Sequence, residues 1–316
     1  MALTSNYSVS DFLKVYGGEV LKAFNHECLV KDRLRMRTIA SGKSATFPTL
    51  AVEEAKLHTP GDDLFGASPD FASDATPGEK VINIDKLLIA PQFVDDLDEA
   101  MNHYDTRSEL AAQAGMALAT AHERWSIAAL GKGAAAAVTT TGSFAALTGA
   151  MVKDAIEKAA QEMDENKVPR EGRALVLPPS EFYLLMKEDD VVSSDFGRGG
   201  DRAAGGAGQL FYMGFEILNS SVMNEYRDTT AAEQKAASGP LYFGGTTQRT
   251  DLSSDLQLCF GVAFQREAAG TVTLKGMQTE ANYIPERQGN LLVAKMAVGV
   301  DILRPEAAFR LKTSAA

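Results

Sequence analysis

The triplet Gly42-Lys43-Ser44 ends the phosphate-binding loop of many nucleotide-hydrolysing enzymes. The complete motif also needs an earlier glycine and a following helix, because backbone amides and the helix N-terminus hold the phosphates. Here the earlier position is Arg37, and Ser44 is followed by Ala-Thr-Phe-Pro, which favours a strand. We therefore interpret the triplet as a glycine turn that leads into a hairpin, and we expect no nucleotide site.

Two further stretches begin a known motif without completing it. His122-Glu123 starts the zinc-binding pattern H-E-x-x-H, but Ser126 occupies the position of the second histidine. The glycine-rich stretch 197–208 lacks the third glycine of a dinucleotide-binding loop, because that position is Arg202. We interpret His122 as a residue of a helix surface or an interface. The sequence therefore predicts no catalytic residues, no metal site and no cofactor.

Composition disfavours several classes of protein. The 316 residues are 45% hydrophobic, which is enough for a substantial core. Acidic residues outnumber basic ones by 42 to 31, and the resulting net charge of −11 disfavours tight binding to nucleic acid or to an anionic membrane. We expect no membrane span, and we expect Cys28 and Cys259 to be reduced thiols.

The N-terminal part predicts a helix followed by a basic segment. Apolar residues recur at helical spacing over 11–27, although Gly17-Gly18 interrupts this helix. Basic residues alternate with others over 31–37, and an extended chain would place their side chains along one edge. These basic residues are Lys31, Arg33, Arg35 and Arg37.

The next part predicts a hairpin and a long helix. Strands expected over 44–52 and 79–89 would pair as a hairpin with a long tip near 58–76. A stretch without proline over 94–130 repeats apolar residues at helical spacing and predicts one helix that ends at Gly131.

The remainder predicts a small α/β unit and returning strands. An amphipathic helix near 150–165 precedes a buried strand over 174–177, and a second helix follows. We expect the strands near the C-terminus to pack on the long helix.

Several sequence blocks resemble those of one viral protein family. They occur in family order from residue 12 to residue 308 and read FLKVYGGEVLKAF, SGKSATFP, GEKVINIDKLL, DLDEAMNHYDTRSEL, MGFEI and LRPEAA. In these blocks and in the order of its predicted elements, the chain resembles the major capsid proteins of the Autographiviridae, the T7-like short-tailed phages. The hairpin tip and the loop 193–208 are this chain's own.

The resemblance implies a mixed α+β fold, the Hong Kong 97-like fold. Its parts would be an N-arm over 1–43, an E-loop hairpin over 44–90, and an α/β A-domain over 149–268. The P-domain would combine 91–148 with 269–316 and would contain the predicted long helix, about 94–130, as its spine helix.

The resemblance also implies a function and partners. Copies of the chain would assemble as pentamers and hexamers into an icosahedral T = 7 shell around double-stranded DNA, which the shell encloses without sequence-specific binding. The shell would assemble in the host bacterial cytoplasm and become the virion capsid, with a scaffolding protein and a portal protein as partners. A nanocompartment of the encapsulin type, which encloses a cargo instead of DNA, shares the fold and is the alternative.

Charge and position select candidate contact and hinge residues. We hypothesise that the basic segment bridges to acidic residues of a neighbouring copy, in pairs worth about 0–1 kcal/mol each and repeated throughout the shell. The alternative is that the segment is solvated or packs within its own chain. The contact candidates are Lys31, Arg33, Arg35, Arg37, Lys43, Phe47, Asp62, Asp63, Asp95, Asp96, Asp98 and Glu99, and the hinge candidates are Gly17, Gly18 and Gly42.

Overall fold

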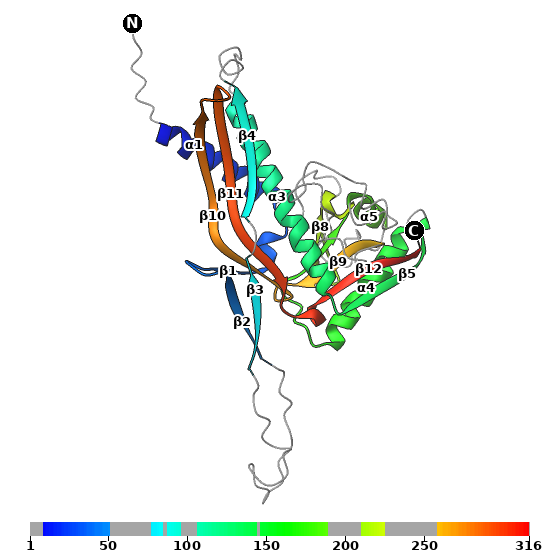
Figure 1. Ribbon diagram of the computed structural model, residues 1–316. Coiled ribbons are helices and arrows are strands. Elements are labelled where there is room, and N and C mark those ends of the chain that lie inside the picture. Colours follow the sequence, from blue (N-terminus) through cyan, green and yellow to red (C-terminus); the bar gives the residue numbers. More distant parts are fainter. Residues whose placement is uncertain are drawn as a thin grey trace, which may run out of the picture.

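The computed structural model folds the chain into two lobes and a projecting hairpin (Figure 1). It describes residues 9–50, 77–84, 87–95, 106–143, 146–188, 210–224 and 258–315. The predicted hairpin tip and the predicted glycine-rich loop lie outside the described residues.

The first lobe is a four-stranded sheet with two helices against one face (Figure 1). Its strands follow the order β1 (Arg35–Thr38), β10 (Ala269–Ile284), β11 (Gly289–Ile302) and β4 (Leu87–Asp95), and its helices are α1 (Val9–Glu27) and α3 (Thr106–Gly133). Tyr16, Val20 and Phe24 are buried between α1 and the rest of this lobe. The helical stripe predicted for 11–27 is therefore confirmed, and α1 runs without a break through Gly17 and Gly18.

The second lobe is built on a six-stranded sheet. Its strands follow the order β5 (Ala136–Ser143), β12 (Ala308–Ala315), β9 (Cys259–Gln265), β6 (Arg173–Leu177), β8 (Phe215–Asn219) and β7 (Leu210–Tyr212). Two short 3-10 helices belong to this lobe. The helix η4 (Ser221–Met223) follows β8, and the helix η6 (Pro305–Ala307) precedes β12. Because α3 contacts β9, β12 and η4 as well as β4 and β11, it crosses both lobes.

Two helices complete the second lobe. The first, α4 (Gly149–Glu165), begins where the Thr148 side chain accepts a hydrogen bond of 3.4 Å from the Met151 amide, and it buries one apolar face. The second, α5 (Pro179–Leu185), has its proline in the first turn, where no amide is needed. These helices and β6 confirm the predicted order of helix, buried strand and helix.

The hairpin has its own small core. Its strands, β2 (Ser44–Leu50) and β3 (Pro77–Asn83), pair antiparallel and project away from both lobes (Figure 1). Phe47 and Ile82 pack with Val272 of β10 in a buried cluster separate from the main core. A side chain at Gly299 of β11 would lie 2.5 Å from the Asn83 carbonyl oxygen, so glycine is required where the hairpin base meets the sheet.

Two predicted elements have different bounds in the structure. The strand expected over 79–89 is two strands, because the chain leaves the hairpin after Asn83 and enters the four-stranded sheet at Leu87. The helix expected from Val94 is wrong at its start, since Val94 and Asp95 pair with β11 as the end of β4. The described helix α3 has 28 residues, about 42 Å at the usual rise, and ends at Gly133 instead of Gly131.

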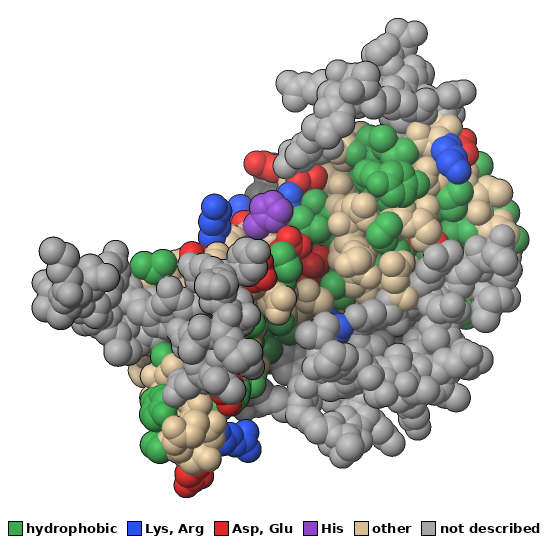
Figure 2. Space-filling view, turned by 90° about the horizontal axis from the view of Figure 1, so that it is seen from above, with side chains coloured by type: hydrophobic (Ala, Val, Ile, Leu, Met, Phe, Trp, Pro, Cys, Tyr) green, Lys and Arg blue, Asp and Glu red, His purple; other side chains and the backbone are tan. Residues whose placement is uncertain are grey.

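Charged side chains are scattered over one face of the molecule. In the face seen in Figure 2, basic and acidic side chains of described residues are interspersed, and no broad area is covered by Lys and Arg alone. Within the described residues, no helix is both long enough and apolar enough to cross a membrane.

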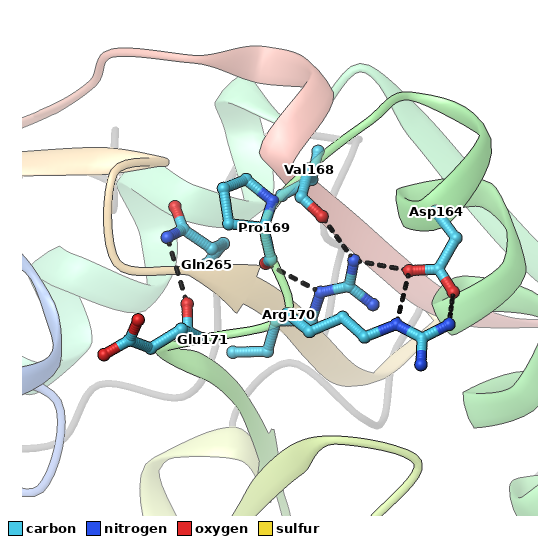
Figure 3. A network of polar contacts seen from close by, with 7 residues as sticks. Asp164, Val168, Pro169, Arg170, Glu171 and Gln265 are labelled. Carbon is cyan, nitrogen blue, oxygen red and sulfur yellow. Dashed lines mark hydrogen bonds and ion pairs between the residues drawn. The ribbon is translucent and has the colours of Figure 1, made fainter.

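A buried arginine, Arg173, joins α4 to β6 in the second lobe. Figure 3 shows the network of polar contacts around its partner Asp164. Arg173 donates hydrogen bonds to Asp164, at 2.7 Å, and to the carbonyls of Val168 and Pro169. Arg170 also donates to Asp164, and these two guanidinium groups, Arg170 first, lower the pKa of that carboxyl group. The turn between α4 and β6 is therefore held by hydrogen bonds that Arg173 donates within its own chain.

Candidate inter-subunit surface

The turn at Gly42 is a joint of the backbone. Gly42 has φ of 109°, a conformation that favours glycine, and Lys43 is exposed. The carbonyl of Lys43 accepts a hydrogen bond of 2.7 Å from the Ile84 amide, and Ser44 begins β2. Because a strand and not a helix follows the triplet, the geometry required for a phosphate-binding loop does not form here.

The basic segment is only half extended. Lys31 and Arg33 belong to the 3-10 helix η1 (Lys31–Arg33), so the prediction that all four basic side chains line one edge is wrong for the first two. Lys31 donates to the Asn25 side chain at 3.1 Å and lies 5.0 Å from the Phe24 ring centroid. Only Arg35 and Arg37 lie on the extended strand β1.

Arg33 has a partner within its own chain. Its Nε donates to Glu216 Oε2 at 2.9 Å and its Nη2 donates to Glu216 Oε1, so the pair is bidentate. This pairing also raises the pKa of the Arg33 guanidinium. Arg33 therefore links the segment after α1 to β8 of the second lobe, which follows the within-chain alternative stated for the basic segment.

Arg35 and Arg37 hold the base of the hairpin. Their guanidinium carbons lie 5.5 and 5.9 Å from the Phe47 ring centroid, and Arg37 donates to the Thr46 carbonyl. Phe47 is 2% exposed, so its side chain packs inside the chain and does not reach a neighbour in this arrangement. Both arginines are exposed, and both remain available to a second copy.

Among the acidic candidates, only Asp95 lies within the described residues. It is the last residue of β4 and is half-buried opposite Gly289 of β11. The other candidates, Asp62, Asp63, Asp96, Asp98 and Glu99, lie outside the described residues. Of the hinge candidates, Gly17 lies beside Thr279 of β10, whereas Gly18 faces open space.

The sequence prediction missed an apolar stripe on the first lobe. Along β4, Leu87, Ile89 and Phe93 are 43%, 49% and 40% exposed, while the alternating Leu88 is buried against the helices. Val293 and Leu291 of β11 lie opposite Pro91 and Phe93 in the register and are only half-buried. We call the side of the four-stranded sheet that carries these residues the open face. Its signal in the sequence is the alternation within LLIAPQFV, residues 87–94.

Reactive side chains do not converge in the described part of the chain. No group of three or more His, Cys, Asp or Glu residues there could hold a metal ion. Cys28 and Cys259 are free and buried, and burial raises the pKa of each thiol to about 11. His122 was predicted to lie at a helix surface or an interface; it is 2% exposed, so the helix-surface alternative is wrong.

Comparison with known proteins places the chain among shell proteins. The family model described as "Gp10A-like: Major capsid protein" matches residues 46–312. The major capsid protein of Escherichia phage T7 is 32% identical over 317 residues, which cover 94% of this chain and 90% of that protein.

Solved structures share the fold. The capsid structure of the cyanophage P-SCSP1u has a TM-score of 0.69 at 29% sequence identity, and the match covers 92% of this chain and 89% of that one. A virus-like particle from Pyrococcus furiosus has a TM-score of 0.59 at 15% identity, with 96% and 100% covered, which is a likeness of fold alone.

Proposed function

Because this chain belongs to the Gp10A-like family of major capsid proteins, we propose that its copies assemble as pentamers and hexamers into an icosahedral phage shell. The proposal extends to assembly in the host bacterial cytoplasm with the help of a scaffolding protein, and to a portal protein set into the shell. The role itself, a structural component of a phage capsid, follows from the family.

The observation that carries the assembly proposal is the open face. Contiguous exposed apolar surface on a soluble chain usually marks a site of association. Here the edge strand β4 presents Leu87, Ile89 and Phe93 in a row. Among the described strands, β4 pairs only with β11, so its other edge could pair with a strand of a second copy. A closed shell repeats one such contact by symmetry, so a modest interface per copy is sufficient.

Charged residues of the hairpin base are a second proposed contact. Arg35 and Arg37 are exposed, and the strands β2 and β3 that they support project away from both lobes (Figure 1). We propose that they pair with acidic residues of a neighbouring copy, with contributions of about 0–1 kcal/mol per pair. Reversing both to Glu should impair assembly, whereas changing both to Gln should impair it less.

Enclosed double-stranded DNA is the proposed content of the shell. The net charge of −11 and the interspersed surface charges give the described face in Figure 2 no broad cationic area to hold phosphates. If the inner face of the proposed shell has the same charge distribution, it would let packed DNA slide instead of adhering.

Electron microscopy of the full chain, expressed alone and with a scaffolding protein, tests the proposal. Closed shells of uniform diameter, built from rings of five and six, are expected. Only subunits or open sheets under both conditions would contradict it. Purified shells that contain an enzyme instead of DNA would favour the encapsulin-type alternative.

A further inference from the structure

Three consecutive ionisable residues of α3 are buried where the two lobes meet. His122, Glu123 and Arg124 are 2%, 4% and 5% exposed. Successive helical residues point about 100° apart, so these three side chains leave the helix in different directions. The helix is therefore enclosed on several sides at this level, and burying charged groups there is costly unless they are neutral or paired.

His122 points toward the end of α1. Its Nδ1 lies 3.5 Å from Cys28 Sγ, and its ring meets the Phe24 ring edge-on at 6.1 Å. Burial, followed by the charge of Lys31, lowers the pKa of His122 to about 4. At neutral pH this side of α3 therefore presents a neutral imidazole to α1 and to the turn that follows it.

Glu123 points toward the second lobe. Its carboxyl group is hydrogen-bonded to Ser220, which lies between β8 and η4, and Glu27 at the end of α1 faces it as a like charge. Its Oε1 atom has no hydrogen-bond partner among the described residues. The Ser220 amide donates to the Leu177 carbonyl at 2.9 Å, so Ser220 is anchored to β6. The carboxyl group thus lies between both lobes, and one of its two oxygens has no partner in the described part of the chain.

Burying the protonated carboxyl group costs less free energy than burying the ionised carboxylate. Burial, which is the largest cause, and the charge of Glu27 raise the pKa of Glu123 to about 7, while the Ser220 hydrogen bond opposes them. The Cys28 thiol also faces this carboxyl group and stays protonated, with a pKa of about 11. Among the described residues, no cation contributes to the Glu123 pKa, so loss of its proton leaves a buried negative charge close to Glu27.

We propose that Glu123 is a proton-controlled joint between the two lobes. With its proton, the carboxyl group lets η4 and the end of α1 close on α3. Without it, the buried charge favours arrangements in which the second lobe moves away and water reaches the carboxylate. All the contacts of this joint lie within one chain, so the proposal can be tested independently of the proposed shell geometry.

The stability of the folded chain depends on pH wherever a group has different pKa values in the folded and unfolded states. Since the pKa of Glu123 in the folded chain is raised from 4.5 to about 7, its stabilising contribution is complete below pH 4.5 and is lost as pH rises through 7. The pKa of His122 is lowered from 6.5, so its contribution is present above pH 6.5 and is lost as pH falls toward 4. The two slopes oppose each other in mildly acidic solution, and above pH 6.5 only that of Glu123 remains.

Hydrogen exchange of the full chain measured at several pH values tests the proposal. After correction for intrinsic exchange rates, opening of the segments around Glu123 and Ser220 should increase between pH 6 and pH 8, with a contribution of about tenfold from Glu123 alone. Glu123→Gln should abolish this increase, because the amide keeps the size of the neutral acid and cannot ionise. Glu109→Gln removes a charge from an exposed position of the same helix and should leave the increase unchanged.

Two further variants should move the transition in opposite directions. Ser220→Ala removes the hydrogen bond that lowers the pKa and should shift the increase to higher pH. Glu27→Gln removes the like charge and should shift it to lower pH. These shifts test the joint even if Glu123→Gln fails to fold. Equal pH dependence in the native chain and in Glu123→Gln, or no shift in either of the other variants, would overturn the proposal.

Discussion

The two sheets of this chain differ in how completely they are covered. In the six-stranded sheet, β6 and β9 are buried at every position. In the four-stranded sheet, β4 alternates buried with exposed side chains, although the exposed ones include Leu87, Ile89 and Phe93. The central strands of the six-stranded sheet have their core completed by the chain itself, whereas β4, at the edge of the four-stranded sheet, leaves a row of apolar side chains for another surface to cover.

This difference separates folding from association. Fully burying a large apolar side chain contributes about 1.5–3 kcal/mol, and the six-stranded sheet gains this within the monomer. On the open face, the same kind of contribution is gained only when a second surface arrives. Substitutions in the two sheets should therefore have separable effects, with stability lost in one and assembly lost in the other.

The largest effect on stability is expected for Phe264→Ala in β9. Phe264 is fully buried, so truncation should lower the free energy of unfolding by about 3–5 kcal/mol. Phe93→Ala on the open face is the matched control and should cost less than about 1 kcal/mol. Denaturant titration of both variants makes the comparison, and equal losses would show that the two sheets are not covered differently.

A smaller loss is expected for Arg33→Ala. Its bidentate bond to Glu216 joins the segment after α1 to the second lobe, and both side chains are partly exposed. We expect a loss of about 1–2 kcal/mol after allowance for solvent screening. Arg35→Ala is the control, because Arg35 is exposed and packs on the Phe47 ring, so its loss should be no more than about 1 kcal/mol. If thermal unfolding shows the same loss for both, Arg33 does not link the lobes.

Local periodicity predicted the covered parts of the molecule well. The helical stripe of α1 and the succession of α4, β6 and α5 follow from residue spacing and capping signals, because each element buries one distinct face or is bounded by prolines. The Gly42 turn was also predicted from a local signal, because glycine adopts positive φ more easily than other residues do.

The open face was missed because β4 is apolar on both sides. In LLIAPQFV, alternation gives little contrast, and a short apolar run fits a strand or a helix equally well. That ambiguity also placed the start of the long helix at Val94. The bond between Arg33 and Glu216 spans 183 positions and has no local signal. Similarly, nothing in the sequence of α3 indicates that His122 and Glu123 are buried.

The smallest effect is expected for Lys43→Ala. Lys43 is exposed, and only its backbone carbonyl holds the turn, so the free energy of unfolding should change by no more than about 0.5 kcal/mol. Calorimetry with ATP should show no binding in either form. Nucleotide binding that disappears with this substitution would restore the phosphate-loop interpretation.

The most direct test of the central claim is the assembly of a chain whose open face is charged. Sedimentation velocity should find only subunit-sized species for the double variant Ile89→Asp, Phe93→Asp, with thermal stability close to that of the native chain. The double variant Ile89→Leu, Phe93→Leu keeps the face apolar and should form shells as the native chain does. Shells at native yield from the charged variant would contradict the claim that the open face is completed by another copy.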